Sequence, residues 1–263
     1  MEIDDQKTLL SEVFGESSES EDDERPQKPK NSLFSGGGSH LTIDQTLNWE
    51  PVKEIKGLWL LRDFLSPQQQ NALLFSIQKE GWFSEASNNQ AMRFGDLPSW
   101  AIELSNSIRE VVLFGDQVSE SAESVSYGGD KDTLFLPPNL FWREPLFDQL
   151  IVNIYQPGEG ICAHVDLLRF EDGIAIVSLE SSCVMHFTQV GEVSDDGNEE
   201  KNEPMSRVPV CLTPGSLVLL CGEARYLWKH EINRKPGIQM WEGQELNQKR
   251  RTSITLRKLC RVE

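Results

Sequence analysis

The second half of the chain is a series of short apolar segments separated by turns, and this pattern limits the fold more than any other feature. Segments rich in β-branched residues and leucine alternate with Pro-Gly, Asp-Gly and single-glycine turns from Gln149 onward. Short strands at this spacing are typical of an antiparallel jelly-roll barrel rather than of parallel βαβ units. The expected strands are 149–155, 161–165, 174–179, 184–190, 207–212, 216–221, 229–233 and 251–259.

The residues before this region predict one strand and two helices. Residues 57–61 form a short apolar strand segment. Ser66 is followed by Pro67 and Gln69, which is the arrangement of an N-cap, a first-turn proline and a capping box. Apolar residues at helical spacing follow this signal and occur again from about Ser99. The expected fold class is therefore α+β, with a jelly-roll barrel flanked by N-terminal helices.

Three polar stretches predict connections between these elements. Residues 89–95 join the two helices, and residues 119–132 form a loop of low hydrophobicity. The acidic residues 191–205 interrupt the strand pattern and predict a surface loop between two strands.

The first 48 residues differ in composition from the rest of the chain. Residues 1–50 hold 12 Asp and Glu against 4 Lys and Arg, and residues 16–38 contain almost no large apolar side chain. Such a sequence cannot bury enough surface to offset the loss of chain entropy. We therefore expect a disordered acidic tail at 1–48, which is a candidate docking segment for a protein partner, and one folded domain at 49–263.

The net charge argues against a nucleic-acid partner, but the distribution of charge does not. The whole chain carries −17, whereas residues 225–263 hold 10 Lys and Arg against 4 Glu. Phosphate binding depends on Lys and Arg, so nucleic acid is compatible with the C-terminal region. The five widely spaced cysteines and the acidic start without a signal peptide predict a cytoplasmic or nuclear protein. No apolar run is long enough to predict a membrane span.

Three side chains predict a metal site. His164 and Asp166 are two residues apart on an extended segment, where alternate side chains share a face. His230, in another expected strand, can supply a third ligand. Two histidines and one carboxylate form a facial triad, which leaves positions open for a keto acid and oxygen at a non-haem Fe(II) centre. A His-x-Asp pair also arises by chance, and we expect His186 to have only a packing or surface role.

The last expected strand carries a second pattern. Alternation places Arg251, Ser253, Thr255 and Arg257 on one face. An ordinary amphipathic strand with its polar face in water has this pattern. A barrel whose interior holds a dianionic co-substrate has it too, because an inward arginine can bind a carboxylate through paired hydrogen bonds. Taken alone, the pattern favours the ordinary strand.

Together these motifs resemble those of the AlkB-type Fe(II)- and 2-oxoglutarate-dependent dioxygenases. The family has N-x-Y-x-P-G, then H-x-D, a distant histidine and R-x-(N/S)-x-T-x-R. This chain carries Asn153-Ile154-Tyr155-Gln156-Pro157-Gly158, His164-Val165-Asp166, His230 and Arg251-Thr252-Ser253-Ile254-Thr255-Leu256-Arg257 in the same order. The resemblance covers roughly residues 57–259 and implies a double-stranded β-helix barrel within an AlkB-like domain at 49–263.

The resemblance assigns roles to these residues by position. His164, Asp166 and His230 are the implied iron ligands and catalytic centre. Arg251 is the implied anchor for the distal carboxylate of 2-oxoglutarate. Arg257 is implied to touch the proximal carboxylate, Asp166 or the substrate. The residues implied to bind the co-substrate are Asn153, Tyr155, Arg251, Ser253, Thr255 and Arg257.

The implied reaction uses Fe(II), 2-oxoglutarate and O2 to hydroxylate a C–H bond, with demethylation when the carbon is an N-methyl group. Residues 222–230 and 170–173 are most similar to the AlkB-like domain of tRNA wobble-uridine hydroxylases. Leu167-Leu168 stands where the bacterial DNA-repair member has an acidic residue that reads the damaged base. We therefore expect a modified nucleobase in RNA, and tRNA in particular, rather than DNA.

Two other functions stay open at this point. One is hydroxylation or demethylation of a protein side chain, and the other is a catalytically idle binding module. In the family, the substrate lid comes from the region before the barrel, here about residues 85–141. The candidate lid residues are Met92, Arg93 and Phe94.

Overall fold

The computed structural model describes residues 48–85, 87–122, 140, 142–191, 207–234 and 239–261. Over these ranges the chain forms two facing antiparallel sheets and two longer helices, which confirms the expected α+β class. The acidic tail expected at 1–48 lies outside the described residues except for its last residue. The surface loop expected at 191–205 also lies outside them, except for Gly191.

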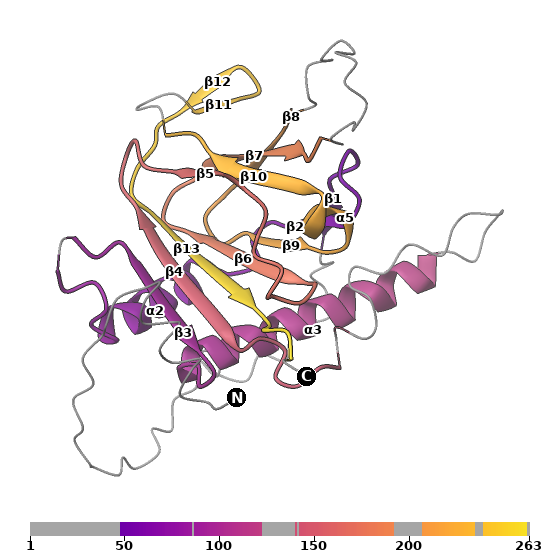
Figure 1. Ribbon diagram of the computed structural model, residues 1–263, viewed down its shortest axis with the longest axis horizontal. Helices are drawn as coiled ribbons and strands as arrows, with labels where there is room; N and C mark the ends of the chain where they lie inside the picture. The colour runs from indigo at the N-terminus through magenta and orange to yellow at the C-terminus, as the bar shows by residue number, and fades with distance from the viewer. Residues whose placement is uncertain are drawn as a thin grey trace, which may run out of the picture. The chain divides into compact units, whose positions relative to one another are not determined.

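The larger sheet has seven strands and carries one half of the candidate site. Its spatial order is β1-β2-β9-β6-β13-β4-β3, and every neighbouring pair is antiparallel. In Figure 1, β3 lies at one edge of this sheet beside β4. The strands are β1 (Trp49–Pro51), β2 (Leu58–Leu61), β9 (Leu217–Leu220), β6 (Ile174–Leu179), β13 (Arg251–Arg257), β4 (Gln149–Tyr155) and β3 (Gln90–Phe94).

The smaller sheet has four strands in the order β5-β10-β7-β8 and carries the other half of the site. These are β5 (Ile161–His164), β10 (Trp228–Ile232), β7 (Cys183–Gln189) and β8 (Arg207–Leu212). A one-turn helix, α5 (Glu223–Tyr226), precedes β10, and a separate hairpin follows it. The hairpin strands are β11 (Gln239–Trp241) and β12 (Gln244–Leu246).

Two helices cover the face of the larger sheet that points away from the smaller sheet (Figure 1). Helix α2 (Pro67–Lys79) begins with the expected capping box, in which Ser66 and Gln69 satisfy each other's backbone amides. Helix α3 is Ser99–Ala122. Apolar residues of both helices pack on the sheet, and representative members of this layer are Leu73, Ile77, Leu104, Ile108, Leu150, Val152, Val177 and Leu256.

A second apolar layer fills the space between the two sheets. It combines one face of β2, β6 and β9 with the inner face of the smaller sheet. Burial of apolar side chains on both faces makes the larger sheet the rigid centre of the molecule. Representative members of the layer are Leu58, Ile176, Met185, Phe187, Val218, Leu220, Trp228 and Ile232.

The observed elements differ from the sequence expectations mainly where polar residues are structured. Residues 90–94, expected in a polar connection, form β3, whose backbone pairs with β4 at the sheet edge. An edge strand is held by backbone hydrogen bonds and shows little apolar alternation, so its pattern is weak. Helix α3 continues to Ala122, so residues 119–122 of the expected loop are helical, and its other residues lie outside the described ranges. None of the helices in the described ranges has the length and apolar character required to cross a membrane.

Candidate active site

A turn and a bulge in the smaller sheet orient the first histidine. The turn after β4 includes Gly158, whose φ of 87° is in the left-handed region that favours glycine. In the pairing of β5 with β10, His164 lies opposite His230 and Ile161 lies opposite Ile232. β5 therefore has one more residue than β10 between these pairs, which is a β-bulge. As a result, Ile161 and His164 both face the cavity although they are three residues apart.

A loop rather than a strand positions Asp166. β5 ends at His164, so strand alternation does not reach the carboxylate. Arg225 of α5 holds this loop through hydrogen bonds to its backbone, and the Arg225 residue is 1% exposed. Arg225 donates to the carbonyl oxygens of Asp166 at 2.9 Å, Leu167 at 2.7 Å and Phe170 at 3.1 Å. One buried guanidinium thus fixes the backbone at and after the carboxylate.

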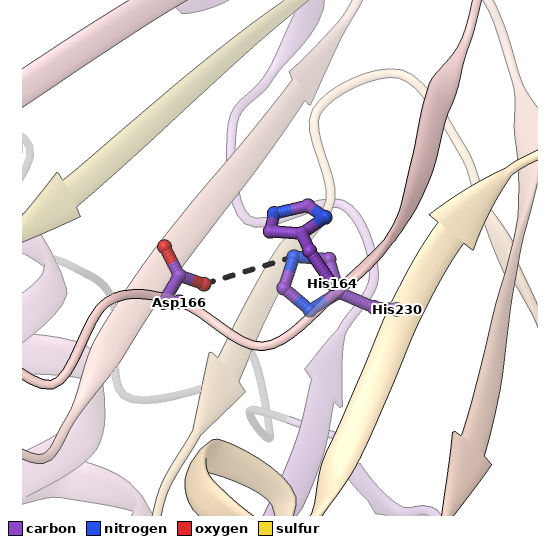
Figure 2. A group of neighbouring side chains, drawn as sticks. All are labelled: His164, Asp166 and His230. Carbon is purple, nitrogen blue, oxygen red and sulfur yellow. Dashed lines mark ion pairs between the residues drawn. The ribbon is translucent and has the colours of Figure 1, made fainter. Parts of the chain in front are cut away.

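The three expected ligands converge on one point (Figure 2). Their candidate donor atoms all lie within 4.8 Å of one another. The rings of His164 and His230 are adjacent, with centroids 4.3 Å apart. His230 Nε2 is 3.7 Å from Asp166 Oδ2, a distance too long for a hydrogen bond. Three donors that face one another without bonding are the arrangement expected around a metal ion.

The protonation states of these groups suit a cation. Burial lowers the pKa of His230 to about 4 despite the nearby carboxylate, so its imidazole is neutral at pH 7. Burial alone would raise the pKa of Asp166, but the electrostatic interactions with His230 and Arg257 outweigh it and hold that pKa below its usual value. His164 Nδ1 lies 2.8 Å from the carbonyl oxygen of Cys162, so Nδ1 donates to that oxygen and Nε2 is the nitrogen left for a metal. Two imidazole nitrogens and one carboxylate are a ligand set that fits Fe(II).

Arg257 reaches Asp166 from the larger sheet. Its Nη1 donates to Asp166 Oδ1, and its Nε donates to Gln149 Oε1 at 2.6 Å. Burial lowers the pKa of Arg257, although the attraction of Asp166 opposes this effect. One carboxylate oxygen is therefore occupied by the guanidinium, while Oδ2 faces His230. Of the three partners that the sequence left open for Arg257, the structure shows the contact with Asp166.

Arg251 lies at the other end of β13, and several of its hydrogen-bond donors have no acceptor among the described residues. Its side chain is 3% exposed, and its Nη2 donates to Ser178 Oγ at 2.7 Å. Its Nε and Nη1 are buried and have no hydrogen-bond partner in the described part of the chain. Burial of an unpaired cation is costly unless a ligand neutralises it. The co-substrate expected here has a free carboxylate that fits this requirement.

All nine residues predicted from the sequence line one cavity between the two sheets. The three expected iron ligands face the polar side of β13 and β4. Tyr155 and Arg251 pair across these strands, and Asn153 accepts a hydrogen bond from Gln90 Nε2 at 2.6 Å. The expected 2-oxoglutarate residues in the lining are Asn153, Tyr155, Arg251, Ser253, Thr255 and Arg257.

The sequence did not indicate three residues that shape this site. Gln90 lines the cavity from β3, Gln149 supports Arg257, and Arg225 holds the Asp166 loop. None of them belongs to a spaced ligand pattern, so their roles appear only when distant strands are brought together. His186 lies on β7 opposite Glu231, and it is not among the residues that line the cavity.

Comparisons with known proteins agree with this geometry. The sequence profile of the 2OG-Fe(II) oxygenase superfamily matches residues 103–257. A tRNA (carboxymethyluridine(34)-5-O)-methyltransferase, alkbh8, from Xenopus tropicalis is 31% identical over 77% of this chain and 32% of its own length. An "Alkylated DNA repair protein ALKBH8 homolog" from Arabidopsis thaliana is 28% identical over 82% of this chain and 60% of its own length. The chain thus spans about a third of the length of the first relative and three fifths of the length of the second.

A solved structure supports the fold independently of sequence. The structure of OsALKBH1 aligns with a TM-score of 0.55 and 14% sequence identity, covering 80% of this chain and all of that one. This similarity concerns the fold alone, whereas the superfamily profile spans more than half of the chain and includes all nine cavity residues predicted from the sequence. The chain therefore belongs to the 2OG-Fe(II) oxygenase superfamily, as an AlkB-like member that uses Fe(II) and 2-oxoglutarate.

Proposed function

We propose that this protein is a dioxygenase that hydroxylates or demethylates a modified nucleobase, in RNA and specifically tRNA rather than in DNA. The observation that carries the proposal is one cavity with three convergent metal-donor atoms and a buried arginine that has no anionic partner among the residues the structure describes. Within this proposal the two facing sheets are a double-stranded β-helix barrel, and residues 49–263 are the oxygenase domain.

In this proposal His164, Asp166 and His230 hold Fe(II). Bound iron supplies the activation of O2, which is coupled to decarboxylation of 2-oxoglutarate and oxidation of a C–H bond. The protein residues keep the ligands in their binding state. Cys162 fixes the tautomer of His164, and Arg257 holds one oxygen of Asp166 so that the other faces the iron.

The co-substrate lies along β13 and β4. Arg251 binds its distal carboxylate through the unpaired Nε and Nη1. Tyr155, whose ring centroid is 5.5 Å from the Arg251 guanidinium, closes the same end of the cavity. Burial raises the pKa of Tyr155 and Arg251 lowers it by less, so its hydroxyl is neutral at pH 7 and can donate a hydrogen bond. Asn153, Ser253 and Thr255 complete the lining.

The choice of nucleic acid rests on similarity and on charge. A relative named for modification of tRNA is 31% identical over most of this chain. Residues 225–263 are rich in Lys and Arg, which suits a polyanionic substrate. The chemical outcome depends on the substrate, because a hydroxylated N-methyl carbon is released as formaldehyde, whereas a hydroxylated C-linked group stays oxidised.

The catalytic part of the proposal is tested by turnover of 2-oxoglutarate. Purified protein with Fe(II) and O2 should convert 2-oxoglutarate to succinate, and His164→Ala should abolish this conversion. The matched control is His186→Ala, which removes a half-buried histidine outside the cavity and should retain turnover. Absence of turnover by the unmodified protein would favour an idle binding module.

The substrate part is tested separately by mass spectrometry of nucleosides. Total tRNA is incubated with the protein, Fe(II), 2-oxoglutarate and O2, and then digested. We expect one nucleoside to gain an oxygen atom or lose a methyl group, and His164→Ala to leave it unchanged. Turnover that oxidises a cellular protein but no tRNA or DNA nucleoside would instead establish a protein hydroxylase or demethylase.

A further inference from the structure

The cavity has two ends, and the proposed co-substrate occupies one of them. Arg251 and Tyr155 are paired at one end of β13, and Arg257 lies six residues further along the same strand. This separation is roughly 20 Å along an extended strand. If Arg251 holds the distal carboxylate of 2-oxoglutarate and its keto acid end reaches the three ligand side chains, the carbon to be oxidised would approach from the Arg257 side. The residues around that end of the cavity are therefore the candidates for substrate contact.

Cations and aromatic rings alternate outward from Asp166 at this end. The Arg257 guanidinium, bound to Asp166, lies 4.1 Å from the centroid of the Phe170 ring. The Arg169 guanidinium lies 5.1 Å from the same ring and 5.6 Å from the ring of Phe94. Phe94 is 38% exposed, so this stack of side chains leads from a metal-ligand candidate to the surface.

Arg169 has no anionic partner in this stack. Its Nε is buried without a hydrogen bond, and its side chain makes no hydrogen bond or ion pair with any residue in the described ranges. The other arginines that contact the same loop are used differently, since Arg225 and Arg143 both donate to its carbonyl oxygens. Arg169 is therefore held in place by aromatic contacts alone, and its donors are available to a ligand.

The surroundings of Arg169 suit a phosphate group that is attached to aromatic bases. Leu167 and Leu168, which precede Arg169 in the chain, are 58% and 76% exposed and give this loop an apolar surface. The acidic residues of the same loop are already engaged, since Glu171 pairs with Arg143 and Asp172 accepts from the Gly222 amide. A guanidinium beside exposed aromatic and aliphatic surface matches a phosphodiester with its attached bases.

We propose that Arg169 binds a backbone phosphate of the nucleic acid next to the nucleobase being oxidised, with Phe94 and Phe170 fixing the guanidinium. This inference rests on the proposed nucleic-acid substrate and adds the residue that positions it. Arg169 is a substrate-binding residue in this scheme and takes no part in iron or 2-oxoglutarate binding.

The test compares Arg169 with a second cation that is also stacked on an aromatic ring. Lys79 is the last residue of α2, and its Nζ lies 4.8 Å from the Phe75 ring centroid. The proteins to be compared are the unmodified chain, Arg169→Gln, Arg169→Lys and Lys79→Gln. The probe is a fluorescein-labelled RNA hairpin with a uridine-rich loop, titrated by fluorescence anisotropy over a series of salt concentrations.

We expect Arg169→Gln to weaken hairpin binding roughly tenfold at low salt, because one charged contact is lost. The slope of log affinity against log salt should become shallower by about 0.7, the value for one phosphate on a single strand. Arg169→Lys keeps the charge and should restore the slope. Lys79→Gln should bind like the unmodified chain.

Turnover of 2-oxoglutarate without RNA, and the melting temperature, are measured for the same four proteins and should be equal. If Arg169→Gln loses either, the guanidinium is a structural group and the assignment is wrong. If the unmodified chain binds the hairpin and Arg169→Gln binds it with equal affinity and slope, only the Arg169 assignment fails. If the unmodified chain turns over 2-oxoglutarate but binds no RNA, the nucleic-acid substrate itself fails, and the assignment fails with it.

Discussion

The two arginines at the ends of β13 share a strand face and are both buried, yet their bonding differs. Arg257 binds Asp166 and Gln149 and stacks on Phe170. Arg251 donates to Ser178 and keeps Nε and Nη1 unpaired. One cation is therefore part of the protein's own structure, whereas the other is reserved for a ligand. The difference predicts opposite results when each is replaced.

Replacing Arg257 should give the largest effect on stability. Arg257→Met leaves the Asp166 carboxylate buried without its cation, and loss of one partner of a buried pair costs about 3 to 5 kcal/mol of unfolding free energy. Urea unfolding followed by circular dichroism measures the change. Arg251→Met is the matched control and should change stability by less than about 1 kcal/mol, because it removes an unpaired charge. If Arg257→Met and Arg251→Met destabilise the protein equally, the two arginines do not differ in their structural role.

Replacing Arg251 should give the largest effect on the co-substrate. Loss of its charged hydrogen bonds should raise the KM for 2-oxoglutarate by roughly 100-fold in Arg251→Met. Arg251→Lys should recover part of this loss, since it keeps the charge but not the paired geometry. The measurement is succinate formation as 2-oxoglutarate is varied. An unchanged KM would mean that the unpaired donors of Arg251 do not face the keto acid.

A smaller effect should appear in alkaline solution at the Arg251 end. Burial raises the pKa of Tyr155 above its usual 10.0, although Arg251 opposes this shift. The folded state therefore retains the phenol proton more strongly than the unfolded chain does. The resulting stability is complete below pH 10.0 and is lost as the pH rises through the folded pKa. Stability of Tyr155→Phe should fall less steeply above pH 10 than that of the unmodified chain. The free energy of unfolding is measured by urea unfolding at several pH values. If it falls equally steeply with pH in both proteins, Tyr155 is not desolvated.

The smallest effect concerns Cys183 near Arg251, which we expect to react slowly with a thiol reagent in the native protein. Burial raises the pKa of Cys183, and Arg251 lowers it by less, so this thiol stays neutral and supplies no anion to the arginine. Of the five cysteines, only the exposed Cys162 and Cys260 should react rapidly with a disulfide reagent at pH 8 in the native protein. Denaturant should expose all five. Rapid native labelling of Cys183 would mean that Arg251 already has a thiolate partner.

The strands and the cavity residues could be predicted because their chemistry is periodic. Alternation along residues 251–257 placed both arginines on one face, and that face lines the cavity. Spacing alone did not show that β5, β10 and β13 contribute to one site, and the resemblance to the family motifs supplied that expectation. Three of the eight expected strands have the observed bounds, and the other five differ by one or two residues at an end, because a strand ends where its partner ends.

The sequence could not predict features that depend on long-range contacts. Asp166 appeared to continue a strand with His164, but β5 ends there and Arg225 holds the carboxylate loop from another part of the chain. The edge strand β3 lacks apolar alternation, because pairing with β4 rather than burial defines it. The availability of Arg169 is likewise visible only when Phe94 and Phe170 are brought together. These contacts join residues too distant in the chain for a local pattern to indicate them.

The extra residue in β5 makes this part of the site tolerant of a loss of three bases in its gene. Ile161 and His164 already share the cavity face, and removal of Cys162 or Ala163 would leave them two residues apart in regular pairing with β10, so both would still face the cavity. β13 pairs regularly with β4, so removal of one residue between Arg251 and Arg257 would turn one of these arginines to the opposite face. The deletion in β5 should therefore keep the three ligand side chains together, whereas the deletion in β13 should yield an inactive protein.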